Sequence, residues 1–126
     1  MKKWIILSLL IAGAIGVSLN SCRNSPFIPV TPQVSFSKDV YPIIIGNCTE
    51  IGCHTSNGQH GGEGFSFSNY NDVMSYGQIS PGNANKSRLY NALIGNGESL
   101  MPKQGELPDN DILTIYLWIE QGAQNN

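Results

Sequence analysis

The sequence predicts an all-α domain in which short helices are joined by long loops. Residues 109–121 place apolar side chains three, four and seven positions apart, which is the spacing of one helix face. Fourteen glycines, several of them clustered in residues 55–64, indicate long loops between the helices. A domain this small and rich in loops usually needs a disulfide, a metal or a cofactor to stabilise it.

The first 21 residues are typical of a bacterial export signal. Two lysines precede an apolar run over residues 4–17, which is shorter than the span of about 20 residues that a membrane requires. Cys22 follows Leu-Asn-Ser, an order that resembles the processing box of lipoproteins. We therefore predict a signal peptide at 1–21 and a lipid on Cys22, in a protein exported to a bacterial membrane and facing the periplasm. An ordinary signal peptide with a spare cysteine, or an uncleaved anchor, is the alternative.

Residues 22–34 are predicted to form an extended linker between the lipid and a domain at 35–126. Prolines recur at every third position, which favours an extended polyproline-type chain: Pro26, Pro29 and Pro32. Once the signal and its two lysines are removed, five of the seven basic residues remain against nine acidic ones. No basic patch suggests nucleic acid as a partner.

The first helix of the domain is expected to lead directly into a pair of cysteines. Ser37 is predicted to cap it, and Pro42 is tolerated about one turn in. Gly46 and Asn47 both accept the left-handed conformation that ends many helices.

Cys48, Cys53 and His54 form the cluster with the most reactive side chains. Two cysteines followed at once by histidine are typical of covalent haem attachment, usually as C-x-x-C-H, whereas here four residues separate the cysteines. A Cys48–Cys53 disulfide is an alternative in an oxidising compartment. Zinc, with His60 as a further ligand, is a third, although adjacent Cys53 and His54 cannot easily face one tetrahedral metal. His60 lies in the glycine-rich loop and is expected at the surface.

Two short helices are expected in the middle of the chain. Ser68 or Asn69 should cap the first, at residues 70–76, and the second should span residues 85–94. The second should bury three aliphatic side chains and turn two polar ones outward: Leu89, Leu93 and Ile94 inside, Ser87 and Arg88 outside.

Met101 is the candidate for a second iron ligand. It is predicted to lie in a loop next to Pro102, which stiffens the backbone, whereas Met74 lies in a predicted helix and is expected to pack in the core. The alternative for Met101 is that its flexible side chain fills a gap in the core.

The last helix is predicted to start at Pro108 and Asp109 and to end at Gly122. Asp109 or Asn110 is expected to cap it. Four residues form its apolar face and three more widen that face: Ile112, Ile115, Tyr116 and Ile119, then Leu113, Leu117 and Trp118. We expect Trp118 in the core.

Taken in order, segments of the chain resemble a small monohaem class I cytochrome c domain, of the kind found in exported bacterial lipoproteins. The matching residues are 36–43, 48–54, 80–82, 87–90, 101–102 and 118–123. The cysteine spacing C-x4-C-H departs from the usual one but occurs as a variant in this group.

The resemblance implies one covalent haem c. Cys48 and Cys53 would form the thioethers, with His54 as the proximal and Met101 as the distal iron ligand. It also implies a cytochrome c-like fold of roughly three to five short helices with long loops around one haem, the first and last packing across each other. The protein would be an electron carrier for redox proteins at the membrane and not an enzyme.

Two other functional classes remain open at this stage. One is a lipid-anchored binding or structural module that a Cys48–Cys53 disulfide staples, without redox function. The other is a haem sensor or peroxidase-like enzyme from which Met101 is displaced.

Overall fold

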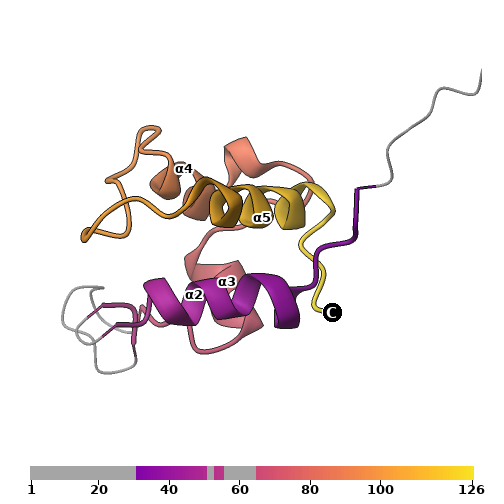
Figure 1. Cartoon of the computed structure of the whole chain (residues 1–126), viewed down its shortest axis with the longest axis horizontal. Coiled ribbons are helices and arrows are strands. Elements are labelled where there is room, and N and C mark those ends of the chain that lie inside the picture. The colour runs from indigo at the N-terminus through magenta and orange to yellow at the C-terminus, as the bar shows by residue number, and fades with distance from the viewer. Residues whose placement is uncertain (1–30, 51–52, 56–64) are drawn as a thin grey trace, which may run out of the picture. The chain divides into compact units, whose positions relative to one another are not determined.

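The described part of the chain is helical, as predicted, and contains no strand (Figure 1). The computed structural model describes residues 31–50, 53–55 and 65–126. The predicted signal peptide, Cys22 and His60 lie outside the described residues. The elements, in chain order, are η1 (Phe36–Val40, a π-helical turn), α2 (Tyr41–Asn47), α3 (Tyr70–Tyr76), η2 (Ala84–Lys86, a 3₁₀ turn), α4 (Arg88–Leu93) and α5 (Asp109–Glu120).

Within residues 31–50, 53–55 and 65–126, no helix is both long and apolar enough to cross a bilayer. Pro32–Asn126 form one compact unit. Its first residues are held to the end of α5, because the Val34 N–H donates to Gln121 Oε1 (2.8 Å) and Gln121 Nε2 donates to the Pro32 carbonyl (3.1 Å).

The first helical run, η1 followed by α2, is capped by Ser35 and not by Ser37 as predicted. Ser35 Oγ accepts from the Lys38 N–H (3.3 Å). The Ser37 hydroxyl instead donates to the main-chain oxygen of Asn126 (2.8 Å), which brings the end of the chain to the start of this run. The prediction failed because two serines lie within three residues, and both hydroxyls also donate to the Asn126 main-chain oxygen; only Ser35 precedes the helix by enough residues to accept from the Lys38 N–H.

The end of α2 also differs from the prediction. The helix stops at Asn47, but Cys48 takes the C-cap position in a right-handed conformation (φ −107°, ψ −20°). No left-handed residue is used, because the chain continues the helical curvature into the cysteine segment. Cys48 is therefore an extension of the helix and shares its rigidity.

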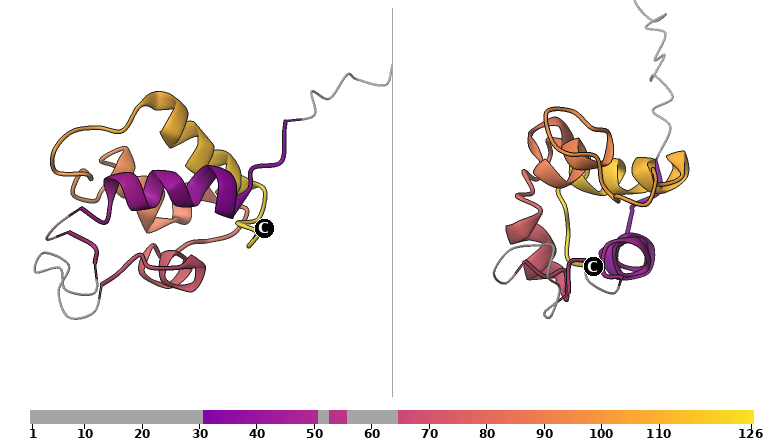
Figure 2. Two further views of the ribbon diagram at one scale, coloured as in Figure 1. Left: turned by 60° about the horizontal axis from the view of Figure 1, so that its bottom comes forward. Right: turned by 90° about the vertical axis from the view of Figure 1, so that its left-hand side faces the viewer.

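An aromatic cluster joins the first helical run to α5 and α3. The ring of Phe36 lies 5.4 Å from Trp118, 5.1 Å from Tyr70 and 5.4 Å from Tyr41, measured between ring centroids. Trp118 is fully buried, as predicted, and its indole N–H donates to the Gln124 carbonyl (2.9 Å). Both views of Figure 2 show α5 beside the first helical run, in agreement with the contacts between η1 and α5.

The helix α3 matches its prediction, whereas the predicted helix at 85–94 is divided in two. Asn69 caps α3 by accepting from the Asp72 N–H (3.1 Å). Ser87 separates η2 from α4 because it is extended (φ −95°, ψ 122°). The prediction that Ser87 faces outward is wrong: it is fully buried and its Oγ accepts from the Ser80 N–H (2.9 Å).

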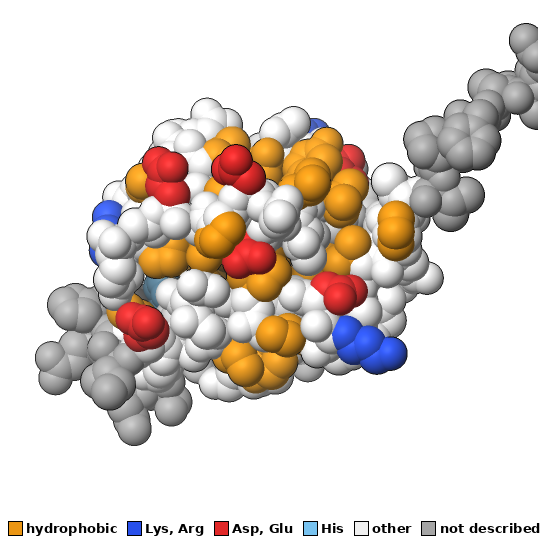
Figure 3. All heavy atoms as spheres, viewed as in Figure 1, with side chains coloured by type: hydrophobic (Ala, Val, Ile, Leu, Met, Phe, Trp, Pro, Cys, Tyr) orange, Lys and Arg blue, Asp and Glu red, His pale blue; other side chains and the backbone are white. Residues whose placement is uncertain are grey.

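Two aliphatic residues predicted to be inside are at the surface. Ile94 is 42% exposed and Leu113 is 51% exposed, whereas Leu89 and Leu93 are buried as predicted. The face drawn in Figure 3 shows hydrophobic side chains interleaved with acidic ones. At the start of α5, Pro108 occupies the N-cap position without a side-chain hydrogen bond, so the predicted Asp or Asn cap is also wrong.

Candidate functional site

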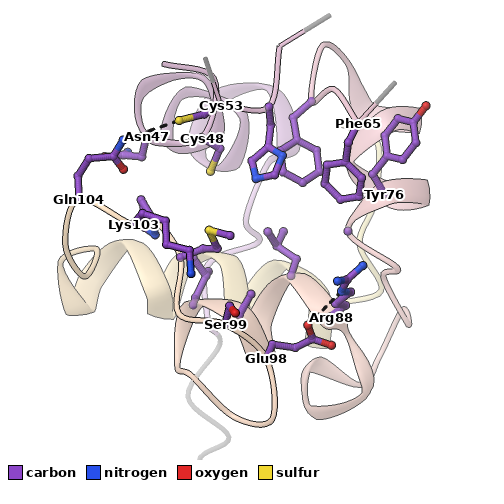
Figure 4. Close-up of a pocket in the computed structure, with 18 residues that line it drawn as sticks. Asn47, Cys48, Cys53, Phe65, Tyr76, Arg88, Glu98, Ser99, Lys103 and Gln104 are labelled. Carbon is purple, nitrogen blue, oxygen red and sulfur yellow. Dashed lines mark hydrogen bonds and ion pairs between the residues drawn. The ribbon is translucent and has the colours of Figure 1, made fainter. Parts of the chain in front are cut away.

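The four predicted site residues of the domain line one cavity. Its volume is about 540 Å³, and Cys48, Cys53, His54 and Met101 are all part of its wall. This volume falls within the roughly 300–1,000 Å³ of ligand and cofactor sites. The close-up in Figure 4 shows Cys48 and Cys53 on one side of the cavity, with the Arg88 side chain across it. The fold therefore brings together residues that lie about fifty positions apart in the sequence.

Short backbone hydrogen bonds fix the cysteine segment to the end of α2. The Cys48 N–H donates to the Ile44 carbonyl (2.8 Å), which continues the helical pattern. The His54 N–H donates back to the Cys48 carbonyl (3.0 Å), and the Cys53 N–H donates to the Glu50 carbonyl (2.9 Å). The chain thus turns back on itself, and the longer spacing between the cysteines is accommodated while Cys48 and His54 stay adjacent in space.

His54 packs against two phenylalanine rings, and one of its nitrogens has no hydrogen-bond partner among the described residues. Its ring centroid lies 4.9 Å from that of Phe65 and 5.0 Å from that of Phe67. Nδ1 is buried and makes no hydrogen bond to any described residue. Such an unsatisfied polar atom costs about 1–3 kcal/mol. Burial lowers the pKa of His54, which favours the neutral imidazole that binds metals.

Cys48 and Cys53 are both free thiols, but their surroundings differ. Cys48 belongs to the buried core and is 9% exposed, whereas Cys53 is more accessible. Burial, together with a smaller effect of the neighbouring Cys53, raises the pKa of the Cys48 thiol to about 11. At neutral pH the buried thiol is therefore uncharged, as suits its apolar setting.

Met101 reaches the cavity from the loop that joins α4 to α5. Its N–H donates to the Ala92 carbonyl in α4 (2.9 Å), which fixes where the loop places the residue. Met101 is half-buried at the cavity wall, so the loop position predicted from the sequence is confirmed. Met74 packs against the hydrophobic core, also as predicted.

A polar rim, which we define as Arg88, Glu98, Ser99, Lys103 and Gln104, lines part of the cavity (Figure 4). Arg88 Nε and Glu98 Oε2 form an ion pair of 3.2 Å. Gln104 Nε2 lies 3.7 Å from Cys53 Sγ and donates to it. Sequence reasoning did not identify this rim. In the sequence each member looks like an ordinary surface residue, and only the folded structure brings them together at the cavity.

The described residues do not support the zinc alternative. Within them, no group of three or more His, Cys, Asp or Glu side chains is placed to hold a metal ion. His60, the further ligand considered for that alternative, lies outside the described residues. No family model, curated protein or solved structure matches this chain.

Proposed function

We propose that this protein is an electron carrier with one covalent haem c, in a cytochrome c-like fold. The observation that carries the proposal is the cavity itself, which gathers two free thiols, an imidazole with an unpartnered buried nitrogen and a thioether. Each of these groups has a use in holding such a cofactor.

The residues present fit the group. Cys48 and Cys53 would hold it through thioethers, and His54 and Met101 would hold its iron. When bound, a haem c with His/Met ligation supplies one-electron oxidation and reduction at a raised potential. The chain itself would orient the imidazole by packing it against Phe65 and Phe67.

The polar rim supports the proposal in a second way. Haem carries two carboxylates, which need cationic or polar partners when they are partly buried. Arg88 and Lys103 provide two positive charges at the cavity wall, and Glu98 balances one of them. In Figure 4 Arg88 lies on the side of the cavity away from Cys48 and Cys53. A carboxylate of the ligand on that side of the cavity would have Arg88 as a cationic partner.

The cellular setting is part of the proposal. A signal peptide at 1–21, lipid attachment at Cys22 and an extended linker would hold the domain at a bacterial membrane and expose it to the periplasm. Redox proteins at that membrane would be its electron donors and acceptors. Transient redox contacts are small, and the interleaved surface in Figure 3 fits such weak docking better than a large permanent interface.

Absorption spectroscopy tests the proposal. The full chain is produced together with a c-type haem attachment system, and spectra are recorded in the oxidised and reduced states. A sharp reduced α-band that requires both Cys48 and Cys53 is expected. A protein without a Soret band, in which the two thiols are oxidised to a disulfide, would instead favour the stapled binding module.

A matched pair of methionine variants tests the distal ligand. Met101→Ala should abolish the weak thioether–iron absorption of the oxidised protein, because the thioether that lines the cavity is lost. Met74→Ala should retain that absorption, because Met74 packs against the core. If the band survives in Met101→Ala, Met101 is not the ligand.

A further inference from the structure

We propose that Gln104 is a positioning residue that holds the Met101 loop against the haem-attachment segment. Its Nε2 donates to Cys53 Sγ over 3.7 Å, and Figure 4 shows the two side chains meeting at one end of the cavity. The inference rests on the proposed haem function. It concerns how firmly that function's distal ligand is kept in place.

The loop at residues 98–107 is tied to α4 at two points. The Glu98 carboxylate pairs with Arg88 (3.2 Å), and the Met101 N–H donates to the Ala92 carbonyl (2.9 Å). Both ties lie at or before Met101 in the chain, and both lead to the same helix. They fix the start of the loop but leave its second half without support from α4.

Gln104 provides the tie to the other side of the cavity. Among residues 31–50, 53–55 and 65–126, its bond to Cys53 is the only hydrogen bond between the loop and the segment from Cys48 to Thr55. Gln104 follows Met101 by three positions, with Pro102 between them to stiffen the backbone. The loop is thus held on both sides of Met101, by α4 before it and by Cys53 after it.

This hydrogen bond is compatible with haem attachment. In the free protein Gln104 donates an amide N–H and the Cys53 sulfur accepts it. When the thiol adds across a vinyl double bond, sulfur bonds to one carbon, the thiol hydrogen goes to the other, and no oxidant is needed. The resulting thioether keeps its lone pairs, so it can still accept from Gln104. The tie would therefore persist in the haem-loaded protein.

Loss of the tie should make Met101 easier to displace. Without it, residues 102–106 are held only through their neighbours, Met101 before them and the buried Leu107 after them, and an external ligand then competes with less resistance. Sulfur is a weak acceptor and Gln104 is exposed, so the bond lies at the lower end of the usual range. We expect imidazole to bind the oxidised protein about two- to fivefold more tightly when the donor is removed.

The experiment compares Gln104→Leu with Glu106→Leu in the haem-loaded full chain. Leucine is similar in length to glutamine and carries no donor. Glu106 is an exposed residue of the same loop that does not line the cavity, so it controls for a new apolar side chain in this loop. Imidazole is titrated while the thioether–iron absorption is followed, and circular dichroism checks that each variant is folded.

The outcomes separate this inference from the proposed function. Tighter imidazole binding in Gln104→Leu but not in Glu106→Leu supports it. Equal binding in Gln104→Leu and the wild type overturns it while leaving the haem proposal intact, and so does an equal increase in both variants. A wild-type protein with no haem or no thioether–iron band overturns the proposed function itself.

Discussion

Replacing Phe36 by alanine tests the packing that supports the candidate site. Phe36 is 5% exposed, and its ring lies within 5.4 Å of three others, including Trp118 of α5. Substitutions of buried phenylalanine by alanine cost about 3–5 kcal/mol. Small domains are stable by only about 5–15 kcal/mol, so the variant should lose a large share of its stability. The helical run that begins at Phe36 ends at Cys48, and its loosening should also lower the yield of attached haem.

Leu113→Ala is the matched control for this substitution. Both changes remove a large apolar side chain, but Leu113 is 51% exposed and should cost no more than about 0.5 kcal/mol. The assay is urea unfolding of the purified proteins, followed by far-ultraviolet circular dichroism and by the fluorescence of Trp118.

Two results would refute the reasoning. A loss below about 1 kcal/mol in Phe36→Ala would show that the ring is not packed between the first and last helices. A loss of stability in Leu113→Ala as large as that in Phe36→Ala would show that Leu113 is packed as tightly as Phe36, in disagreement with its exposure in the structure.

Three further predictions concern single side chains. Ser87→Ala should destabilise the protein by about 1–3 kcal/mol in the same urea assay, because the Ser80 N–H loses its buried acceptor; an unchanged midpoint would contradict this. In the haem-free protein, alkylation near neutral pH should modify Cys53 before Cys48, because the pKa of about 11 leaves little thiolate at Cys48. The rate at which Cys48 is alkylated should increase as the pH rises. Peptide mass spectrometry that finds Cys48 modified first would contradict the burial of this thiol. The N-terminal peptide of the mature wild-type protein should begin at Cys22 and carry the mass of a lipid, which Cys22→Ser should lack; a wild-type N-terminal peptide without that lipid would exclude Cys22 as the anchor.

The sequence predicts the local elements well where their signals are local. Asn69 and the residues after it form a capped helix with its own start signal, and the structure places α3 at the predicted residues. Trp118 is correctly predicted as core because it lies in a strongly apolar helix. Cys48, Cys53 and His54 are adjacent in sequence, so their meeting at one site requires little from the fold.

The errors arise where tertiary contacts decide. The sequence suggests that Ser87 is a polar residue on an outer helix face, but it is buried, and its hydroxyl accepts from the Ser80 N–H and donates to the Asn83 carbonyl. Leu113 completes an apolar helix face in the sequence, yet about half of its surface is exposed. Gln104 carries no sequence signal at all, since its contact with Cys53 depends on how the loop folds back across fifty residues.

The most direct test of the central claim is the mass of the purified chain after co-production with a c-type haem attachment system. The account predicts that one haem remains bound under denaturing conditions that extract non-covalent haem, and that digestion recovers it on the peptide containing Cys48 and Cys53. A chain with the mass of the unmodified polypeptide, or a haem that extraction removes, would contradict the account.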